Sequence, residues 1–247
     1  MNKLDLGKFE AVIFDLDSTL NNTHSYPFVA TEWLFKNSGL DSEELMASYL
    51  RNLVIRYRKG IQAIVAGAPY RSPFDIVHTA MTHTLEDIEQ SVNPALVKEA
   101  AQRFKALHLE LSTPYDGVIG ILEKLKTREI KIGLVTNSFE GHARILVTNM
   151  ELVHFFSSIV DSGDVKAFKP MKEPFEKVLR ELDVDVSRAL YVGDEYYADM
   201  VGAKSVGMMT VWINNRGGSL EDQVAKYGAS TTPDFVLNSI TEFGELF

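Results

Sequence analysis

The sequence contains no cysteine, no long hydrophobic run and no internal repeat. Without cysteine there is no disulfide framework, no thiolate metal site and no cysteine nucleophile. No stretch approaches the roughly 18 consecutive apolar residues of a membrane-spanning helix. The sequence also lacks low-complexity tracts. These absences exclude disulfide scaffolds, repeat arrays and membrane-spanning proteins.

Positive charge is also in deficit. The chain has 25 lysines and arginines against 34 aspartates and glutamates, a formal net charge of −9. Binding to nucleic acid or to an anionic membrane needs a basic face, so we expect neither partner. If the substrate is an anion, a local feature must reverse the sign of the overall charge. The first residues are charged and show no signal peptide, so we expect a cytoplasmic protein, either a monomer or a homodimer.

The sequence does contain a series of short apolar runs that turn residues separate. Hydrophobic residues make up 45% of the chain, enough for a substantial core. Helical patterns lie between most of these runs, as in 118–126, 174–182 and 197–206. Strands that alternate with helices predict an α/β fold with a Rossmann-like, doubly wound and mostly parallel sheet. The expected strands are 9–14, 131–135, 158–160, 189–192, 209–213 and 235–237.

One long segment does not follow this alternation, and no strand is apparent in it. Its apolar residues from Met46 to Tyr57 recur at intervals of four and three, which places them on one helix face. Those from Leu96 to Leu107 do the same. We therefore expect about four helices that form a second, inserted domain. The expected domains are an α/β core over 1–20 and 115–247 and a helical domain over 21–114.

Two aspartates, Asp15 and Asp17, follow the first expected strand. Residues two apart on an extended chain point the same way. Both carboxylates would then lie at the carboxyl end of a strand, where open α/β sheets bind ligands. Close carboxylates repel, which raises one pKa or requires a cation between them. The alternative is an ordinary turn, because Asp and Ser are common turn residues.

Thr136, Asn137 and Lys169 follow later strands. At the end of a strand, the hydroxyl of Thr136 and the backbone N–H groups around Asn137 can hold an anion. The same residue types also begin helices. Lys169 precedes a proline, which favours an extended backbone and can present a fixed positive charge to the same edge. The alternative for Lys169 is an ordinary surface position.

Asp194 and Asp199 follow the expected strand 189–192, where a helix begins. They are a little over one helical turn apart. Carboxylates at the end of a strand suit a hard divalent cation with oxygen ligands, such as Mg²⁺. The alternative is that Asp194 caps the helix and that Asp199 lies on the surface.

The four motifs occur in the order Asp pair, Thr, Lys, Asp pair, each at the end of an expected strand. They read FDLDSTL, VTNS, FKP and VGDEYYAD. This combination resembles the haloacid dehalogenase (HAD) superfamily of phosphohydrolases, over residues 8–22 and 113–247. The helical insertion resembles the cap domain that this family carries between its first two motifs.

The resemblance implies a Mg²⁺-dependent phosphatase that hydrolyses a small phosphorylated metabolite through an aspartyl-phosphate. Asp15 would attack phosphorus, and Asp17, with a raised pKa, would act as general acid and base. Thr136 and Asn137 would hold the phosphoryl oxygens. Lys169 would pair with the same oxygens and with Asp15. The implied Mg²⁺ ligands are Asp15, the backbone carbonyl of Asp17, Asp194 and, directly or through water, Asp199.

Asp17 separates this function from others in the family that the sequence resembles. Haloacid dehalogenases and phosphonate hydrolases lack an acid at that position, so Asp17 disfavours both reactions. Sugar phosphomutases retain it and stay an alternative. A catalytically silent binding protein is the other alternative, although it would be expected to have lost one of the four charged motif residues. All four are present: Asp15, Asp17, Lys169 and Asp194.

Two further positions bear on the metal and the substrate. Glu195 stands where many family members have Ser or Thr, and it either contacts the metal or caps a helix. We favour the capping role. In the insertion, Arg71 lies in a turn and is the best candidate to contact a second anionic group of the substrate, with a solvated turn as the alternative. The sequence does not indicate which metabolite is hydrolysed.

Overall fold

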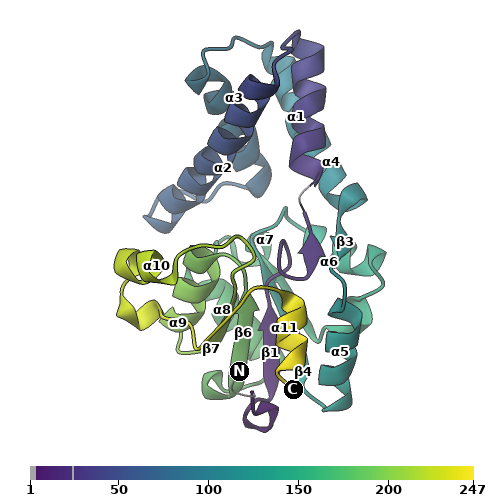
Figure 1. The fold of residues 1–247 in the computed structure, drawn as a ribbon, viewed down its shortest axis with the longest axis vertical. Coiled ribbons are helices and arrows are strands. Elements are labelled where there is room, and N and C mark those ends of the chain that lie inside the picture. Colours follow the sequence, from purple (N-terminus) through teal and green to yellow (C-terminus); the bar gives the residue numbers. More distant parts are fainter. Residues whose placement is uncertain (1–3, 24) are drawn as a thin grey trace. The chain divides into compact units, whose positions relative to one another are not determined.

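The computed structural model describes residues 4–23 and 25–247, and the chain divides into two compact units (Figure 1). The core unit comprises Met1–Asn22 and Thr113–Phe247, and the cap unit comprises Thr23–Ser112. The core unit is an α/β domain and the cap unit is helical. In the described residues, no helix combines the length and apolar character that crossing a membrane requires.

The core unit is built on a sheet of six strands that all run parallel. These strands are β1 (Ala11–Phe14), β4 (Lys131–Thr136), β5 (Ser158–Asp161), β6 (Ala189–Gly193), β7 (Met209–Ile213) and β8 (Phe235–Leu237). Their order across the sheet is β5-β4-β1-β6-β7-β8. All four residues of β1 are fully buried, as expected of a central strand covered on both faces. The predicted α/β class with a parallel sheet is confirmed.

Helices cover both faces of this sheet (Figure 1). The helices of the core unit are α5 (Val118–Thr127), α6 (His142–Asn149), α7 (Ser162–Val165), α8 (Lys172–Leu182), α9 (Gly202–Ser205), α10 (Leu220–Tyr227) and α11 (Ile240–Glu245). On one face, Ile13 of β1 and Tyr191 of β6 share a core with Phe175 of α8. On the opposite face, Phe14 contacts Phe243 of α11, with ring centroids 5.8 Å apart. Successive residues of β1 therefore serve the two faces in turn.

The helix expected over 197–206 is divided in the structure. A π-helical segment, η4 (Tyr196–Val201), precedes the short helix α9. π-Helical segments are rare and are frequent at functional sites. Here the segment carries Asp199.

The cap unit has four helices in its described residues. They are α1 (Ser25–Ser38), α2 (Glu43–Val65), α3 (Pro73–Asp87) and α4 (Pro94–Leu111). α1 packs against α4, and α2 packs against α3. Three of the helices begin at a residue whose side chain accepts a backbone N–H, as good N-caps do: Ser42, Ser72 and Asn93. These caps and the apolar faces explain why this segment is helical.

Two short strands pair where the chain leaves and re-enters the core unit. β2 (Asn21–Asn22) and β3 (Thr113–Pro114) form an antiparallel ribbon. The prediction that 21–114 contains no strand is therefore wrong at both ends of that range. Two residues are too few to produce an alternating hydrophobic pattern. The ribbon brings the outgoing and the returning chain side by side.

Candidate active site

Asp15 is fixed at the carboxyl edge of the sheet. Its backbone N–H donates to the carbonyl oxygen of Val192 at 2.9 Å, so the ladder continues one residue beyond β1. A tight loop follows, in which three backbone N–H groups donate to the carbonyl oxygen of Leu16. Ser18 adopts a φ of 66°, which residues other than glycine rarely adopt. The loop places the hydroxyl of Thr19 3.1 Å from Asp15 Oδ2, to which it donates.

Lys169 holds the other oxygen of Asp15. Its Nζ lies 2.6 Å from Asp15 Oδ1 and 2.7 Å from Asp199 Oδ1, and all three side chains are buried. Burial disfavours the charged amine, but attraction to both carboxylates outweighs it and raises the pKa of Lys169 well above its usual value. The positively charged ammonium of Lys169 is therefore held in contact with the carboxylate of Asp15.

The side chain of Asn137 positions Lys169. Its Nδ2 donates to the carbonyl oxygen of Lys169 at 3.0 Å, and its Oδ1 accepts the backbone N–H of Lys169 at 2.8 Å. These two bonds give the side-chain amide of Asn137 a positioning role, and the expected contact of Asn137 with substrate stays a prediction. Thr136, the residue before it, is buried at the carboxyl end of β4, the strand beside β1.

Asp194 follows β6 and is held from the neighbouring strand. Trp212 Nε1 of β7 donates to the backbone oxygen of Asp194 at 2.9 Å. Burial raises the pKa of the Asp194 carboxyl well above its usual value, against the attraction of Arg216, whose Nη2 lies 2.8 Å from Asp194 Oδ2. Although this ion pair is close, Oδ2 is buried and accepts no hydrogen bond from the residues that the structure describes. A cation that binds Oδ2 must therefore compete with Arg216.

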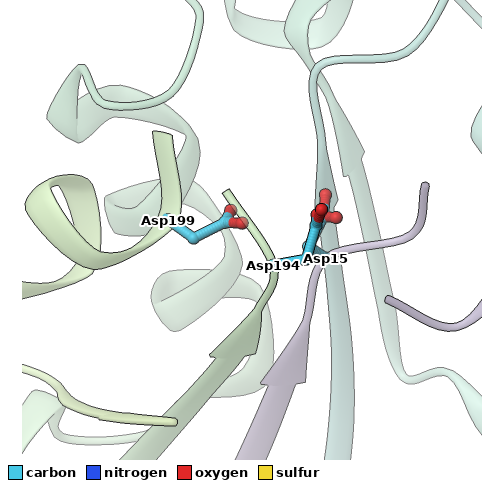
Figure 2. Close-up of side chains that lie close together, drawn as sticks. All are labelled: Asp15, Asp194 and Asp199. Atoms are coloured by element: carbon cyan, nitrogen blue, oxygen red, sulfur yellow. The ribbon is translucent and has the colours of Figure 1, made fainter. Parts of the chain in front are cut away.

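Three carboxylates meet at this edge of the sheet. One oxygen from each of Asp15, Asp194 and Asp199 lies within 4.8 Å of the other two. Figure 2 shows Asp15 and Asp194 at the ends of neighbouring strands, with Asp199 pointing toward them. Burial raises the pKa of Asp15 to about 7; Lys169 opposes this rise, and the charges of Asp199 and Asp17 add to it. The acids exceed what one lysine neutralises, so the cluster suits a divalent cation.

The donor set fits Mg²⁺, which takes oxygen ligands at roughly 2.0–2.1 Å in octahedral geometry. Asp15 and Asp194 are the better candidates for direct ligands. Asp199 is the weaker candidate, because its two oxygens accept three hydrogen bonds, from Lys169, Tyr191 and the Glu195 backbone N–H. The two oxygens of Asp15 accept one side-chain bond each. The carboxylate of Asp17 is outside the cluster and accepts from Asn21 Nδ2 at 3.2 Å. The expected metal contact of Asp17 was through its backbone carbonyl, and that expectation stays a prediction.

Glu195 occupies the N-cap position of η4, the place that the sequence favoured for it. Its side chain makes no capping hydrogen bond at the start of η4. Asp199 reaches back over the first turn of η4 and accepts the Glu195 backbone N–H instead. Gly193 makes this approach possible, since a Cβ at Gly193 would lie 2.4 Å from Asp199 Cγ and Oδ2.

Arg71 lies in the cap unit. Its guanidinium donates to the carbonyl oxygen of Asp75 at 2.9 Å and to the hydroxyl of Thr79, both within α3. These contacts join the turn that carries Arg71 to the helix that follows it. The expected contact of Arg71 with substrate stays a prediction.

Four further residues contact this site: Thr19, Tyr191, Gly193 and Arg216. Thr19 lies within the first motif and could have been recognised there as a hydroxyl beside the aspartate. Arg216 follows a strand in the turn Asn-Asn-Arg-Gly-Gly, a position at the ligand-binding edge. Gly193 and Tyr191 give no such signal, because a strand glycine and a strand tyrosine usually reflect packing.

Comparison with known proteins agrees with this geometry. Residues 12–213 match the family described as haloacid dehalogenase-like hydrolase, and the chain belongs to this family. It is similar to the pyrophosphatase PpaX of Bacillus anthracis, with 26% identity over 235 residues that cover 95% of this chain and 94% of that protein. The predicted resemblance to the HAD superfamily is therefore confirmed.

Two solved structures share the fold along nearly the whole chain. YfnB of Bacillus subtilis, solved with magnesium, matches with a TM-score of 0.77 and 20% identity, covering 96% of this chain and 98% of that one. The L-2-haloacid dehalogenase of Xanthobacter autotrophicus matches with a TM-score of 0.68 and 18% identity, over 96% and 98% of the chains. At these identities the likeness shows the fold alone, so the site residues must decide the reaction.

Proposed function

We propose that the protein is a Mg²⁺-dependent phosphatase that hydrolyses a small phosphorylated metabolite through an aspartyl-phosphate on Asp15. The observation that carries the proposal is the fixed Asp15 carboxylate, with Lys169 Nζ 2.6 Å from one oxygen and Thr19 Oγ1 3.1 Å from the other. A carboxylate aligned in this way suits in-line attack on phosphorus. The pyrophosphatase name of the PpaX relatives supports chemistry at phosphorus.

Each residue of the site then has a chemical task. Asp15 forms the bond to phosphorus, and Lys169 neutralises charge on Asp15 and on the transferring group. Asp17 gives a proton to the leaving oxygen and later takes one from the attacking water. Its bond from Asn21 orients its carboxylate for this work. Mg²⁺, held by Asp15 and Asp194, would supply positive charge to the phosphoryl oxygens.

Asp17 also argues against dehalogenation, although a solved dehalogenase shares the fold. Displacing a halide needs no proton on the leaving group, whereas the alkoxide that leaves a phosphomonoester needs one. Asp17 lies two residues after the nucleophile, where it can supply that proton. Sugar phosphomutase and silent binding protein are the alternatives that the experiment below must distinguish.

The test is phosphate release from p-nitrophenyl phosphate and from a panel of phosphorylated metabolites, with and without Mg²⁺. We expect release that depends on Mg²⁺ and that Asp15→Asn abolishes while the thermal unfolding midpoint shows an intact fold. Asp185→Asn is a suitable control because Asp185 is an exposed carboxylate that binds Ser187. No release from any ester would refute the phosphatase, and phosphate transferred between sugar positions would indicate a mutase.

Inorganic pyrophosphate belongs on the panel because the similar curated proteins are pyrophosphatases. Its leaving group is a phosphate, which needs less protonation than an alkoxide. Asp17→Asn should therefore lower kcat/KM, which reports formation of the aspartyl-phosphate and not the later attack of water, far more for an alkyl phosphomonoester than for pyrophosphate. An equal loss of kcat/KM on both substrates would remove Asp17 from the role of general acid.

A further inference from the structure

Four oxygen atoms surround the ammonium of Lys169, which has three protons to donate. Nζ lies 2.6 Å from Asp15 Oδ1, 2.7 Å from Asp199 Oδ1, and 3.0 Å from both the Val135 carbonyl oxygen and Tyr191 Oη. Two of these partners are carboxylates, and only Asp15 is the proposed nucleophile. Asp199 therefore competes with the nucleophile for the charge of Lys169.

The hydroxyl of Tyr191 contacts both the lysine and this competitor. It accepts from Lys169 Nζ and donates to Asp199 Oδ1, with a distance of 3.0 Å in each case. An ionised carboxylate only accepts, so the phenol must be the donor in the second bond. Burial and the charge of Asp199 raise the pKa of Tyr191 well above its usual value, so the donor stays protonated.

The phenol has little freedom to leave this position. Tyr191 is fully buried, and it is paired with Ile13 in the register of β1 and β6. Its ring meets that of Phe175 edge to face, with centroids 5.2 Å apart. A fixed donor on Asp199 Oδ1 offsets part of the negative charge of that oxygen, which weakens its hold on Lys169.

We propose that Tyr191 is a positioning residue whose hydroxyl, by donating to Asp199 and accepting from Lys169, keeps the ammonium on Asp15 instead of letting it shift onto Asp199. This inference rests on the proposed function of Asp15. It gives Tyr191, a buried residue of β6 in the hydrophobic core, an indirect role in catalysis. The substrate need not touch Tyr191 for this role.

The first test compares Tyr191→Phe with Tyr196→Phe. Both changes remove one buried hydroxyl from the same hydrophobic core, but Tyr196 Oη bonds to Thr231 O at 3.0 Å. With p-nitrophenyl phosphate and Mg²⁺, we expect Tyr191→Phe to lower kcat about tenfold and leave KM within about twofold. Tyr196→Phe should change neither by more than about twofold. Equal kcat losses in the two variants would overturn the proposal.

A second test asks whether Tyr191 acts through Asp199. In an Asp199→Asn background the competing charge is gone, so Tyr191→Phe should cost less than about twofold in kcat. A loss that is the same in both backgrounds would mean that the hydroxyl serves packing alone. Tyr196→Phe in the same background is the control and should stay additive.

A third measurement does not depend on turnover. In metal-free protein labelled with ¹⁵N-lysine, the ammonium resonance of Lys169, assigned with Lys169→Arg, should shift in Tyr191→Phe and stay in place in Tyr196→Phe. If the Lys169 resonance shifts only in Tyr191→Phe but no phosphate ester is hydrolysed, the proposed phosphatase function is refuted and the contact between Tyr191 and Lys169 is supported. If esters are hydrolysed and the resonance does not move in Tyr191→Phe, the positioning role fails alone.

Discussion

Gly193 and Asp199 are in such close approach that the carboxylate of Asp199 occupies the space where a side chain at Gly193 would begin. Any Cβ at this position would lie 2.4 Å from Asp199 Cγ and Oδ2, which is closer than real contacts allow. The close approach lets Asp199 accept from both Lys169 and the Glu195 backbone. The absence of a Cβ at Gly193 therefore allows the position that the Asp199 carboxylate takes beside Lys169.

Gly193→Ala should consequently lower activity at least about a hundredfold, because a Cβ there displaces Asp199 and so disrupts the carboxylate cluster around Asp15 and Asp194. Gly120→Ala is the matched control, since a Cβ at Gly120 in α5 meets nothing within 4 Å. In a helix that control should stabilise the fold slightly. Phosphate release and thermal unfolding of both variants test the pair. Wild-type activity in Gly193→Ala would show that the Asp199 contact is dispensable.

The hydroxyl of Thr19 should matter for turnover more than for stability. Thr19→Val keeps the shape of a fully buried side chain but removes the donor to Asp15 Oδ2. We expect kcat to fall about tenfold, because the nucleophile loses one of its two orienting bonds. Thr31→Val in the cap unit removes a comparable buried hydroxyl, which bonds to Pro27 O, and should leave kcat unchanged. Similar kinetics for the two variants would contradict this role of Thr19.

Arg216 should weaken binding of Mg²⁺. Its Nη2 lies 2.8 Å from Asp194 Oδ2, so it repels a cation at that oxygen. Arg216→Gln should lower the Mg²⁺ dissociation constant several-fold, measured by calorimetry on metal-free protein. Arg188→Gln is the control, because Arg188 pairs with Glu10, which precedes β1 at the opposite end of that strand. Weaker Mg²⁺ binding in Arg216→Gln would instead mean that the arginine helps to hold the metal.

The stability of the metal-free protein should fall as the pH rises toward 7. The pKa of Asp15 is raised from 3.8 to about 7, and that of Asp194 is raised as well. Between these values the folded state binds protons that the unfolded state has lost, so the free energy of unfolding decreases with increasing pH. Mg²⁺ should restore the stability most near pH 7, where the carboxylates are ionised. Scanning calorimetry at several pH values measures how the free energy of unfolding changes with pH. Asp15→Asn is the comparison, in which this change should be smaller. A free energy of unfolding that rises toward pH 7 would contradict the prediction.

The sequence predicted those parts of the fold and site that depend on local pattern. β1 is a continuous apolar run that ends in Asp15, so its place at the edge of a parallel sheet follows from the sequence. The ribbon β2–β3 and the side-chain contacts could not be predicted, because they depend on residues far apart in the chain. Asn137 could be placed near an anion by its motif, but only the packed structure shows its amide on the Lys169 backbone.

The ribbon β2–β3 has a consequence for how such a protein can vary. β2 and β3 are antiparallel, hydrogen-bonded neighbours. The two ends of any inserted segment are therefore held close together by the core unit. The entropic cost of closing a longer or shorter insert grows only with the logarithm of its length. The insert can therefore be replaced without displacing Asp15, so the helical segment and the carboxylate site are free to vary independently of each other.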